Sequence, residues 1–337
     1  MARTLKRLTF LTLTAVLLLG WFVYHIATPV PLPIVPYEFS IKQGSSVKTV
    51  AKQLADEGVL RDEWSFVFLS RMIGVATSLK AGDYQLLTSI SPLKLLRRIT
   101  KGDVNQSEIR FIEGWTFAQL RQTLNENSAL RHDTANLSDR EILKRIGATE
   151  TAAEGLFFPD TYFFPRGSSD LAILKRAYRA MRNHLDTAWA GRAVNLPLND
   201  NYQALILASI VEKETGKGSD RGKVAAVFIN RLRSGMLLQT DPTIIYGLGN
   251  KFDGNLRKKD LSTDHEYNTY MRPGLPPTPI ALPGLASIEA VLNPAETDAL
   301  YFVAKGNGDS HFSNNLDDHN RAVMKYQKSL SLSRPQR

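Results

Sequence analysis

The 337-residue chain contains no cysteine, which excludes disulfide bonds, thiolate nucleophiles and cysteine-based metal sites. Other catalytic signatures are missing too. The six histidines never form the His-Glu-x-x-His pattern of zinc hydrolases, and no Gly-x-Ser-x-Gly elbow marks a serine hydrolase. No Ser-x-x-Lys motif occurs with the partner motifs of penicillin-binding enzymes, and both nucleotide-binding glycine fingerprints are absent. We therefore expect neither a metal nor a cofactor.

Positive charge is in excess, with 42 lysine and arginine residues against 33 aspartate and glutamate residues. The net charge is +9, and Arg3, Lys6 and Arg7 supply three of these charges, which leaves +6 for the rest of the chain. A basic exterior attracts nucleic acid, anionic lipid or acidic polymers. Because the next segment is predicted to cross a membrane, we expect no nucleic-acid partner.

An apolar run without charged side chains covers residues 8–27, close to the ~20 residues that a helix needs to span a bilayer. Basic residues precede this run and none follows it immediately, which predicts that residues 1–7 form a cytoplasmic tail. A cleaved signal peptide is the alternative. The run is long for one, and Trp21 and Tyr24 suit a membrane interface better than a small-residue cleavage site. We expect a single-pass anchor, with everything after Thr28 outside the membrane.

The region after the anchor divides into a linker and a small module. Four prolines in residues 28–37 predict a stiff, extended tether. The apolar spacing in residues 38–105 predicts a strand, two helices, a second strand and a further helix. Strand, helix, helix, strand is the order of a small LysM-like carbohydrate-binding module, and a plain structural spacer is the alternative.

Residues 106–337 are predicted to form a mixed α/β domain, which gives the whole chain an α+β fold. Helices are expected as far as residue 235, after which glycine and proline become dense and predict loops with short strands. Residues 301–312 are predicted to form a hairpin, and the polar tail after Ser329 is expected to be loose.

Two glutamates end the most apolar helix of the chain. Residues 205–211 are nearly all apolar, and they lead into Glu212 and Glu214 before the helix is expected to stop at Gly216. A carboxyl group on such a buried helix resists ionisation, which raises its pKa toward the range of an acid catalyst. The two side chains point about 200° apart, and both have apolar residues behind them. The spacing does not choose between them, and a structural role for both stays open.

Polar and aromatic side chains are frequent in the segments that follow this helix. Amide, hydroxyl and phenol groups bind the hydroxyl and acetamido groups of sugars, while aromatic rings cover sugar faces. Each segment alone is compatible with ordinary turn chemistry. Together they predict a site for a neutral polyhydroxylated ligand, with these candidate binding residues: Gln239, Thr240, Asp241, Tyr246, Asn268 and Tyr270.

Six motifs follow one another in a fixed order through the chain. On these motifs the sequence resembles the endolytic murein transglycosylase family, also called MltG or YceG-like, and the resemblance covers essentially the whole chain. The motifs are EGLFFPDTY at 154–162, ASIVEKE at 208–214, VFINRL at 227–232, LQTDPT at 238–243, YNTY at 267–270 and GLPP at 274–277.

The resemblance implies an enzyme of the lyase class that cuts the bond between N-acetylmuramic acid and N-acetylglucosamine in peptidoglycan strands. It implies that Glu214 is the catalytic acid and that 106–337 is the catalytic domain. It further implies attachment to the inner membrane, a periplasmic catalytic domain, and work beside peptidoglycan synthases (penicillin-binding proteins) that limits the length of new glycan strands.

The implied mechanism needs one carboxyl group. Protonated Glu214 would donate to the glycosidic oxygen, and the ionised group would then take the proton of the muramic acid 6-hydroxyl, which closes a 1,6-anhydro ring. Glu212, Asp160 and Tyr162 are expected to support the site. A hydrolytic muramidase would need a second carboxylate, for which Asp241 and Asp160 are the candidates. A non-catalytic wall-binding scaffold is the other alternative.

Overall fold

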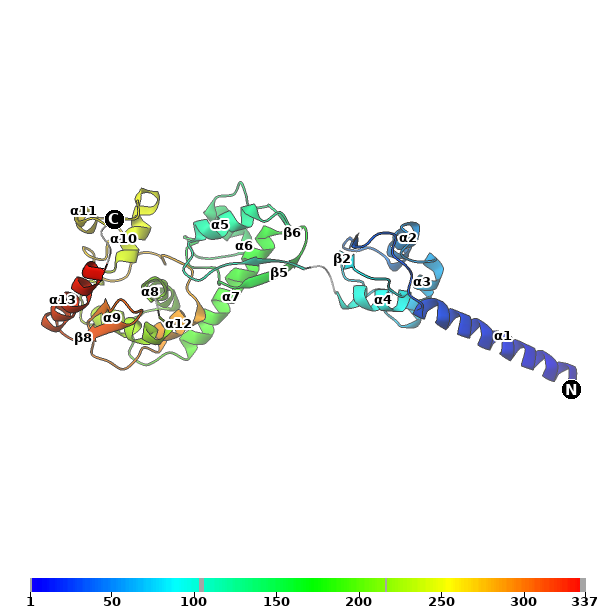
Figure 1. The fold of residues 1–337 in the computed structure, drawn as a ribbon. Helices are drawn as coiled ribbons and strands as arrows, with labels where there is room; N and C mark the ends of the chain where they lie inside the picture. Colours follow the sequence, from blue (N-terminus) through cyan, green and yellow to red (C-terminus); the bar gives the residue numbers. More distant parts are fainter. Residues whose placement is uncertain (1, 103–105, 216, 334–337) are drawn as a thin grey trace. The chain divides into compact units, whose positions relative to one another are not determined.

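The computed structural model describes residues 2–102, 106–215 and 217–333, and it is a mixed α/β structure. The chain forms two compact units, which are described separately (Figure 1). The N-terminal unit contains Met1–Glu108 and Phe163–Ser168, and the C-terminal unit contains Ile109–Tyr162 and Ser169–Arg337. The predicted domain boundary after residue 105 falls at residues 103–105, which lie outside the described residues, and it stays a prediction.

The N-terminal unit begins with a long helix, α1 (Ala2–Ala27). Within the described chain, α1 is the one helix long and apolar enough to cross a membrane, over Thr9–Ala27 with a mean hydropathy of 1.9. Its side chains are mostly exposed, but those of Phe22 and Ile26, near its C-terminal end, join a hydrophobic core. The helix therefore ends inside the folded module and not in a free linker.

The module that follows has the predicted order of strand, helix, helix, strand. Its elements are β1 (Tyr37–Ile41), α2 (Val47–Asp56), α3 (Glu63–Met72), β2 (Gly82–Leu86) and then α4 (Pro92–Lys101). The two strands pair antiparallel. Each helix starts at a capping side chain that accepts a backbone N–H, as sequence rules for helix starts expect; these caps are Ser46, Asp62 and Ser91.

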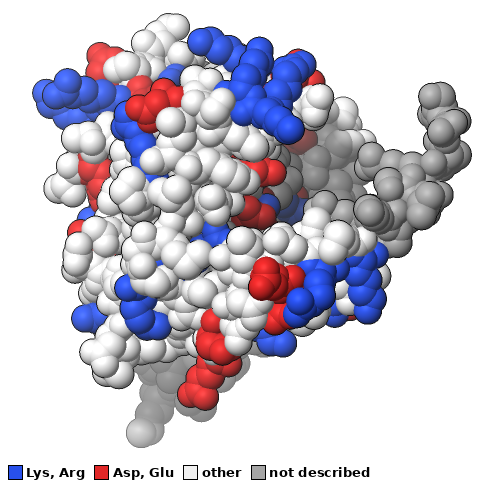
Figure 2. All heavy atoms as spheres, turned by 90° about the vertical axis from the view of Figure 1, so that its left-hand side faces the viewer, with Lys and Arg blue, Asp and Glu red and all other residues white. Residues whose placement is uncertain are grey.

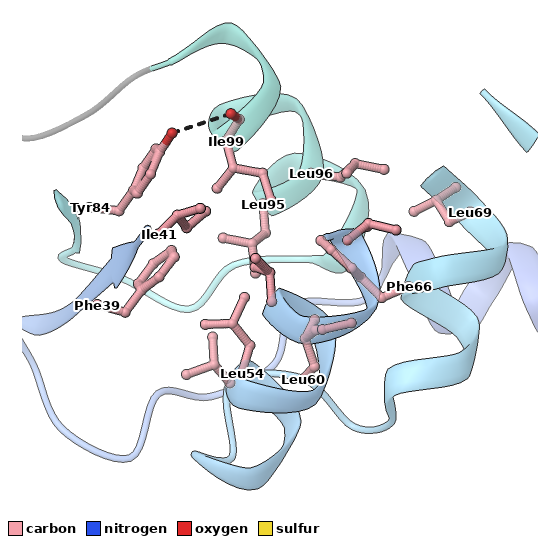
Figure 3. Packing of buried hydrophobic residues seen from close by; sticks show 14 of the residues in the cluster. Phe39, Ile41, Leu54, Leu60, Phe66, Leu69, Tyr84, Leu95, Leu96 and Ile99 are labelled. Carbon is pink, nitrogen blue, oxygen red and sulfur yellow. Dashed lines mark hydrogen bonds between the residues drawn. The ribbon is translucent and has the colours of Figure 1, made fainter. Parts of the chain in front are cut away.

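Alternating side chains of the strands and one face of each helix meet in a single core (Figure 3). Phe39 stacks on Tyr84 with ring centroids 5.3 Å apart. The buried hydroxyl of Tyr84 donates to the backbone oxygen of Ile99, 3.2 Å away, so this polar group is satisfied without water. Phe66 and Leu69 bring α3 into the same core (Figure 3).

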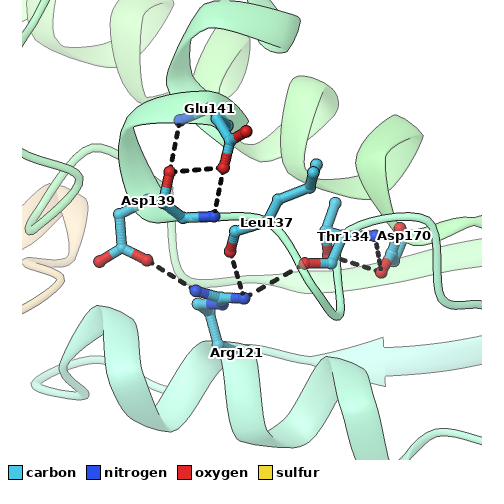
Figure 4. A network of polar contacts seen from close by, with 7 residues as sticks. Arg121, Thr134, Leu137, Asp139, Glu141 and Asp170 are labelled. Atoms are coloured by element: carbon cyan, nitrogen blue, oxygen red, sulfur yellow. Dashed lines mark hydrogen bonds and ion pairs between the residues drawn. The ribbon is translucent and has the colours of Figure 1, made fainter.

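The first part of the C-terminal unit surrounds a long helix, α7 (Asp170–Ala190). It contains α5 (Phe117–Glu126), β4 (Leu130–Arg131) and α6 (Asp139–Ile146), and the division between the units runs through β3 (Gln106–Arg110), β5 (Thr161–Pro165) and β6 (Ser168–Ser169). Strand β3 pairs with β5, and β4 pairs with β6. Figure 4 shows the polar network that fixes the loop between α5 and α6: Arg121 donates to Asp139 and to two loop carbonyls, and buried Asp170 accepts from Thr134.

The second part is built around α8 (Asn201–Glu214), which packs against α7, α9 (Arg221–Arg233) and α12 (Leu285–Leu292) (Figure 1). All eight residues from Ala204 to Val211 are buried, as the apolar run predicted. The helix ends at Glu214, and the predicted stop at Gly216 lies outside the described residues.

The prediction of loops and short strands after residue 235 was wrong in part. This region holds α10 (Asp241–Leu248), α11 (Lys258–Ser262), α12 and α13 (Leu316–Ser333). Helix α13 also corrects the expected loose tail after Ser329 as far as Ser333. The predicted hairpin is present as β7 (Tyr301–Ala304) and β8 (Ser310–Ser313). Short 3-10 turns occupy Gly218–Asp220 and Gly249–Lys251.

Candidate active site

The two carboxyl groups at the end of α8 have different surroundings. The carboxylate of Glu212 accepts the backbone N–H of Gly284 at 3.0 Å and the hydroxyl of Ser287 at 2.7 Å, and a guanidinium nitrogen of Arg221 lies 4.0 Å away. These donors come from the start of α12 and of α9, so Glu212 fastens three helices together. This placement supports the structural role expected for Glu212.

Glu214 faces the start of α10. Its Oε1 accepts a hydrogen bond from the hydroxyl of Thr240, the residue that precedes α10. Burial raises the pKa of Glu214, the Thr240 hydroxyl lowers it, and the negative charge of nearby Asp241 raises it again, with a net rise. A carboxyl group in this setting favours its protonated form, which is the form that a general acid needs.

Thr240 is itself held from several sides. Its backbone N–H donates to the hydroxyl of Thr269 at 3.2 Å, and its carbonyl accepts from Thr243 at 2.8 Å. The residue before it, Gln239, has a positive φ of 50° and donates its backbone N–H to the Thr269 carbonyl at 3.0 Å. The backbone is thus bent and anchored where the Thr240 hydroxyl must reach Glu214.

Arg231 on α9 fixes the approach to this bend. Its guanidinium donates to the carbonyls of Leu237 and Leu238 at 3.1 and 2.9 Å and to the Leu300 carbonyl at 2.7 Å. The group lies over the ring of Tyr301, 5.0 Å from its centroid, and is buried. The sequence analysis gave Arg231 no role, although an arginine within the apolar motif VFINRL is a signal of a buried charge that needs partners.

Tyr270 and Asp241 meet beside Glu214. The Tyr270 hydroxyl donates to the Asp241 carboxylate at 2.6 Å. Burial and the charge of Asp241 raise the pKa of Tyr270, and the charge of Glu214 adds to this rise. Thr240, Asp241 and Tyr270 therefore lie together at Glu214, while the side chain of Gln239 is exposed and accepts a 3.4 Å bond from Arg231.

Asn268 requires a correction. Asn268 is 0% exposed. The side-chain amide donates to the carbonyls of Leu261 and Thr263, at 3.1 and 2.7 Å, and its oxygen accepts the backbone N–H of Tyr270 at 2.9 Å. No surface of Asn268 is left for a ligand, so its place is to hold the loop that carries Tyr270, and not to bind sugar as expected.

Tyr246 belongs to a second cluster, in which Tyr246 and Tyr267 are half-buried and Glu154 is buried. The Tyr246 hydroxyl lowers the pKa of the Glu154 carboxyl group, and the Tyr246 ring meets Tyr267 edge-on at 5.0 Å. Glu154 is 7% exposed and accepts the backbone N–H of Phe117, at the start of α5, with oxygen–nitrogen distances of 2.9 and 3.2 Å. Burial raises the pKa of Glu154 to about 7. The sequence analysis missed Glu154 as a functional candidate, although it opens the first motif.

Asp160 and Tyr162 support the fold of the region around β5. Asp160 is exposed, its carboxylate accepts the backbone N–H of Thr161, and its carbonyl accepts from Phe111. The buried Tyr162 ring packs on Phe111, and its hydroxyl donates to the Phe158 carbonyl at 2.7 Å. These contacts give Asp160 no bond to the Glu214 cluster, so Asp241 is the better placed of the two proposed second carboxylates.

The charges on this end of the C-terminal unit are unevenly spread. Figure 2 shows the face where α10, α11 and α13 lie, with a hollow that has acidic side chains in its wall and lysine and arginine side chains above and below.

Within the described residues, no three histidine, aspartate or glutamate side chains gather as a metal site. The chemistry that this geometry offers is proton transfer by one carboxyl group beside hydroxyl and phenol groups.

Comparisons with known proteins agree with the motifs. A family model described as YceG-like matches residues 39–325. An endolytic murein transglycosylase of Bacillus subtilis (strain 168) is 33% identical over 305 residues, which cover 85% of this chain and 84% of that protein. One of Streptococcus pneumoniae serotype 2 is 29% identical over 350 residues, covering 92% of this chain and 63% of that protein.

A solved structure is also similar. The crystal structure of a protein described as yceG-like from Listeria monocytogenes aligns with a TM-score of 0.53 and 28% identity, and the match covers 85% of this chain and 98% of that one. The family match extends from the small module after α1 into α13, so both units take part in it.

Proposed function

The chain belongs to the YceG-like family, and from this premise we propose that it is an endolytic murein transglycosylase, a lyase that cuts glycan strands of peptidoglycan. The relatives from Bacillus subtilis and Streptococcus pneumoniae carry that name. The chain spans 84% of the first relative and less than two thirds of the second, so the activity is proposed for the region that the sequences share.

We propose that Glu214 acts first as acid and then as base. The observation that supports this role is its setting: a carboxyl group with a raised pKa, one hydroxyl donor from Thr240, and the negative neighbour Asp241. Glu214 would protonate the glycosidic oxygen as the sugar gains oxocarbenium character. The ionised group would then accept the proton of the muramic acid 6-hydroxyl, which attacks the anomeric carbon and leaves a 1,6-anhydro end.

The products of digestion test this proposal. Purified peptidoglycan strands are digested with the wild-type chain and with Glu214→Gln, and the new strand ends are weighed by mass spectrometry. We expect anhydro ends, one water lighter than reducing ends, from the wild type and none from the variant. Reducing ends would instead support a muramidase in which Asp241 assists a water molecule, and unchanged cleavage by the variant would reject Glu214 as the acid.

We further propose that α1 is a single-pass anchor in the inner membrane, with residues 1–7 in the cytoplasm and the units after Thr28 in the periplasm. The apolar span Thr9–Ala27 and the basic residues before it support this topology. An enzyme held at this surface would meet new glycan strands as synthases release them, and cutting there would end their elongation. The module with β1 and β2 is proposed as LysM-like, with a glycan as its ligand.

A further inference from the structure

Helix α3 of the N-terminal unit is apolar on its outward side as well as on its inward side. Phe66 and Leu69 face the module core, yet the outward residues Trp64, Phe68 and Met72 are also apolar and are 71%, 54% and 62% exposed. Their spacing of four residues places the three side chains in one stripe along the helix. A soluble domain rarely leaves a contiguous apolar stripe in water, so the stripe calls for a partner.

The other helices of the module show that this pattern is specific to α3. Helices α2 and α4 bury comparable apolar faces, but their outward positions carry charges, among them Lys52 on α2 and Lys94 and Arg97 on α4. The outward faces of α2 and α4 are therefore ordinary charged helix surfaces. The apolar outer face of α3 is a local feature.

Two contacts fix the direction of α3 beside the end of α1. The His25 ring nitrogen lies 2.8 Å from the carboxylate of Asp62, which caps the start of α3, while Phe22 meets Phe68 edge-on with centroids 5.3 Å apart. The earlier residue of α1 thus touches the later residue of α3. Over this stretch α3 crosses α1 obliquely and runs partly against its direction, so the C-terminal end of α3, with Met72, lies farther back toward the apolar span Thr9–Ala27 than its start does.

We propose that the stripe Trp64–Phe68–Met72 rests in the outer interface of the phospholipid bilayer that holds α1. This inference rests on the proposed anchor. Its physical reason is that Phe22 and His25 already lie within the apolar span, so a helix that runs back beside them reaches the lipid surface. Tryptophan at the shallow end of the stripe, with Lys48 5.9 Å from its ring centroid, matches the residues common at membrane interfaces.

The bilayer contact would give the module a fixed orientation on the membrane. A single helix lets an attached domain rotate and tilt, whereas a second contact beside it restricts both motions. The core shared by α1 and the module already removes a flexible joint at Ile26. The module would then present a constant face to glycan strands near the membrane.

Spin labels measure this contact directly, because a chain without cysteine gives no background labelling. The full chain is purified and reconstituted alone in phosphatidylethanolamine–phosphatidylglycerol vesicles, with single labels at Trp64→Cys, Phe68→Cys or Met72→Cys. Lys52→Cys on α2 is the control for water, and Leu18→Cys in α1 is the control for lipid. Collisions with oxygen and with a water-soluble nickel chelate, present on both sides of the membrane, give the depth of each label.

We expect the labels on α3 to be several-fold less accessible to nickel than the Lys52→Cys label, with depth increasing from Trp64 to Phe68 to Met72. If the Leu18→Cys label is in lipid while all α3 labels match the Lys52→Cys label, the inference is wrong and the anchor stands. If the Leu18→Cys label is in water, the anchor and the inference both fail. Thermal melting checks each variant, and Met72→Cys disturbs none of the ring contacts that join α3 to α1.

Discussion

Glu212 and Glu214 are two residues apart on one helix, and the structure gives them opposite surroundings. Glu212 is tied by a backbone N–H, a hydroxyl and a more distant guanidinium, all from neighbouring helices. Glu214 has the hydroxyl of Thr240 and a carboxylate nearby. The same apolar helix thus carries one carboxyl group that fastens the fold and one that favours its protonated form. The donors and charges near each carboxyl group, and not its position on the helix, decide whether that group stabilises the fold or favours its protonated form.

The largest expected effect comes from exchanging the two carboxyl groups for amides one at a time. Glu214→Gln keeps the shape but removes the proton donor, so we expect kcat to fall by about 10²–10⁴-fold, the usual contribution of a general acid. Glu212→Gln should retain most of the activity per folded molecule. Rates of release of soluble glycan fragments check this, and equal losses in both variants would erase the proposed difference between them.

A third carboxyl group, that of Glu154, is expected to make the stability of the protein depend on pH. Its pKa is about 7 in the folded protein against 4.5 when unperturbed, because burial disfavours its charged form. Between these values the folded protein binds more protons than the unfolded chain, so this group's contribution to stability falls as pH rises through that window. The shift corresponds to about 3 kcal/mol.

Glu154→Gln should remove this pH dependence, because an amide does not titrate. Urea unfolding of the wild type and the variant, measured from pH 4.5 to 7, gives the difference directly. The wild type should lose stability relative to the variant as pH rises. Parallel curves over this range would mean that Glu154 titrates alike in the folded and unfolded states.

Removing the Glu212 side chain should affect stability more than chemistry. Glu212→Ala leaves the Gly284 N–H and the Ser287 hydroxyl without their acceptor, which costs about 1–3 kcal/mol. Chemical denaturation measures this loss, and the rate per folded molecule should change little. A variant as stable as the wild type but inactive would assign Glu212 to the reaction.

Smaller changes around Glu214 should move its pKa in opposite directions. Thr240→Val removes the hydroxyl that favours the ionised form, so the pKa should rise; Asp241→Asn removes the negative neighbour, so it should fall. Because the acid must be protonated, the alkaline limb of the pH–rate profile should shift upward in the first variant and downward in the second. Shifts in the same direction would contradict the assigned surroundings.

The sequence predicted those parts of the fold that depend on local periodicity. The strand–helix–helix–strand order of the module and the buried run of α8 followed from apolar spacing, and both are confirmed. The later helices were missed because glycine and proline obscured short periodic segments. For α10, the proline after Asp241 marks a helix start, where a missing N–H costs nothing, and not a stiff loop.

Three of the candidate binding residues lie beside Glu214, but the sequence did not predict their geometry. Thr240, Asp241 and Tyr270 meet Glu214, whereas Asn268 turned inward to bond its own loop and Tyr246 turned toward Glu154. A polar side chain in a loop serves either a ligand or the loop itself, and sequence does not distinguish these uses. Arg231 and Thr269 hold the bend at Gln239 through contacts between distant segments, which local patterns do not reveal.

The most direct test of the account is the titration of the Glu214 carboxyl group itself. Carbon-13 NMR of side-chain-labelled glutamates, with the Glu214 signal assigned by its loss in Glu214→Gln, reports this pKa in the resting enzyme. We predict a value clearly above the 4.5 of an unperturbed glutamate. A Glu214 signal that titrates at 4.5 or below would contradict the claim that the protein holds this group ready to give up a proton.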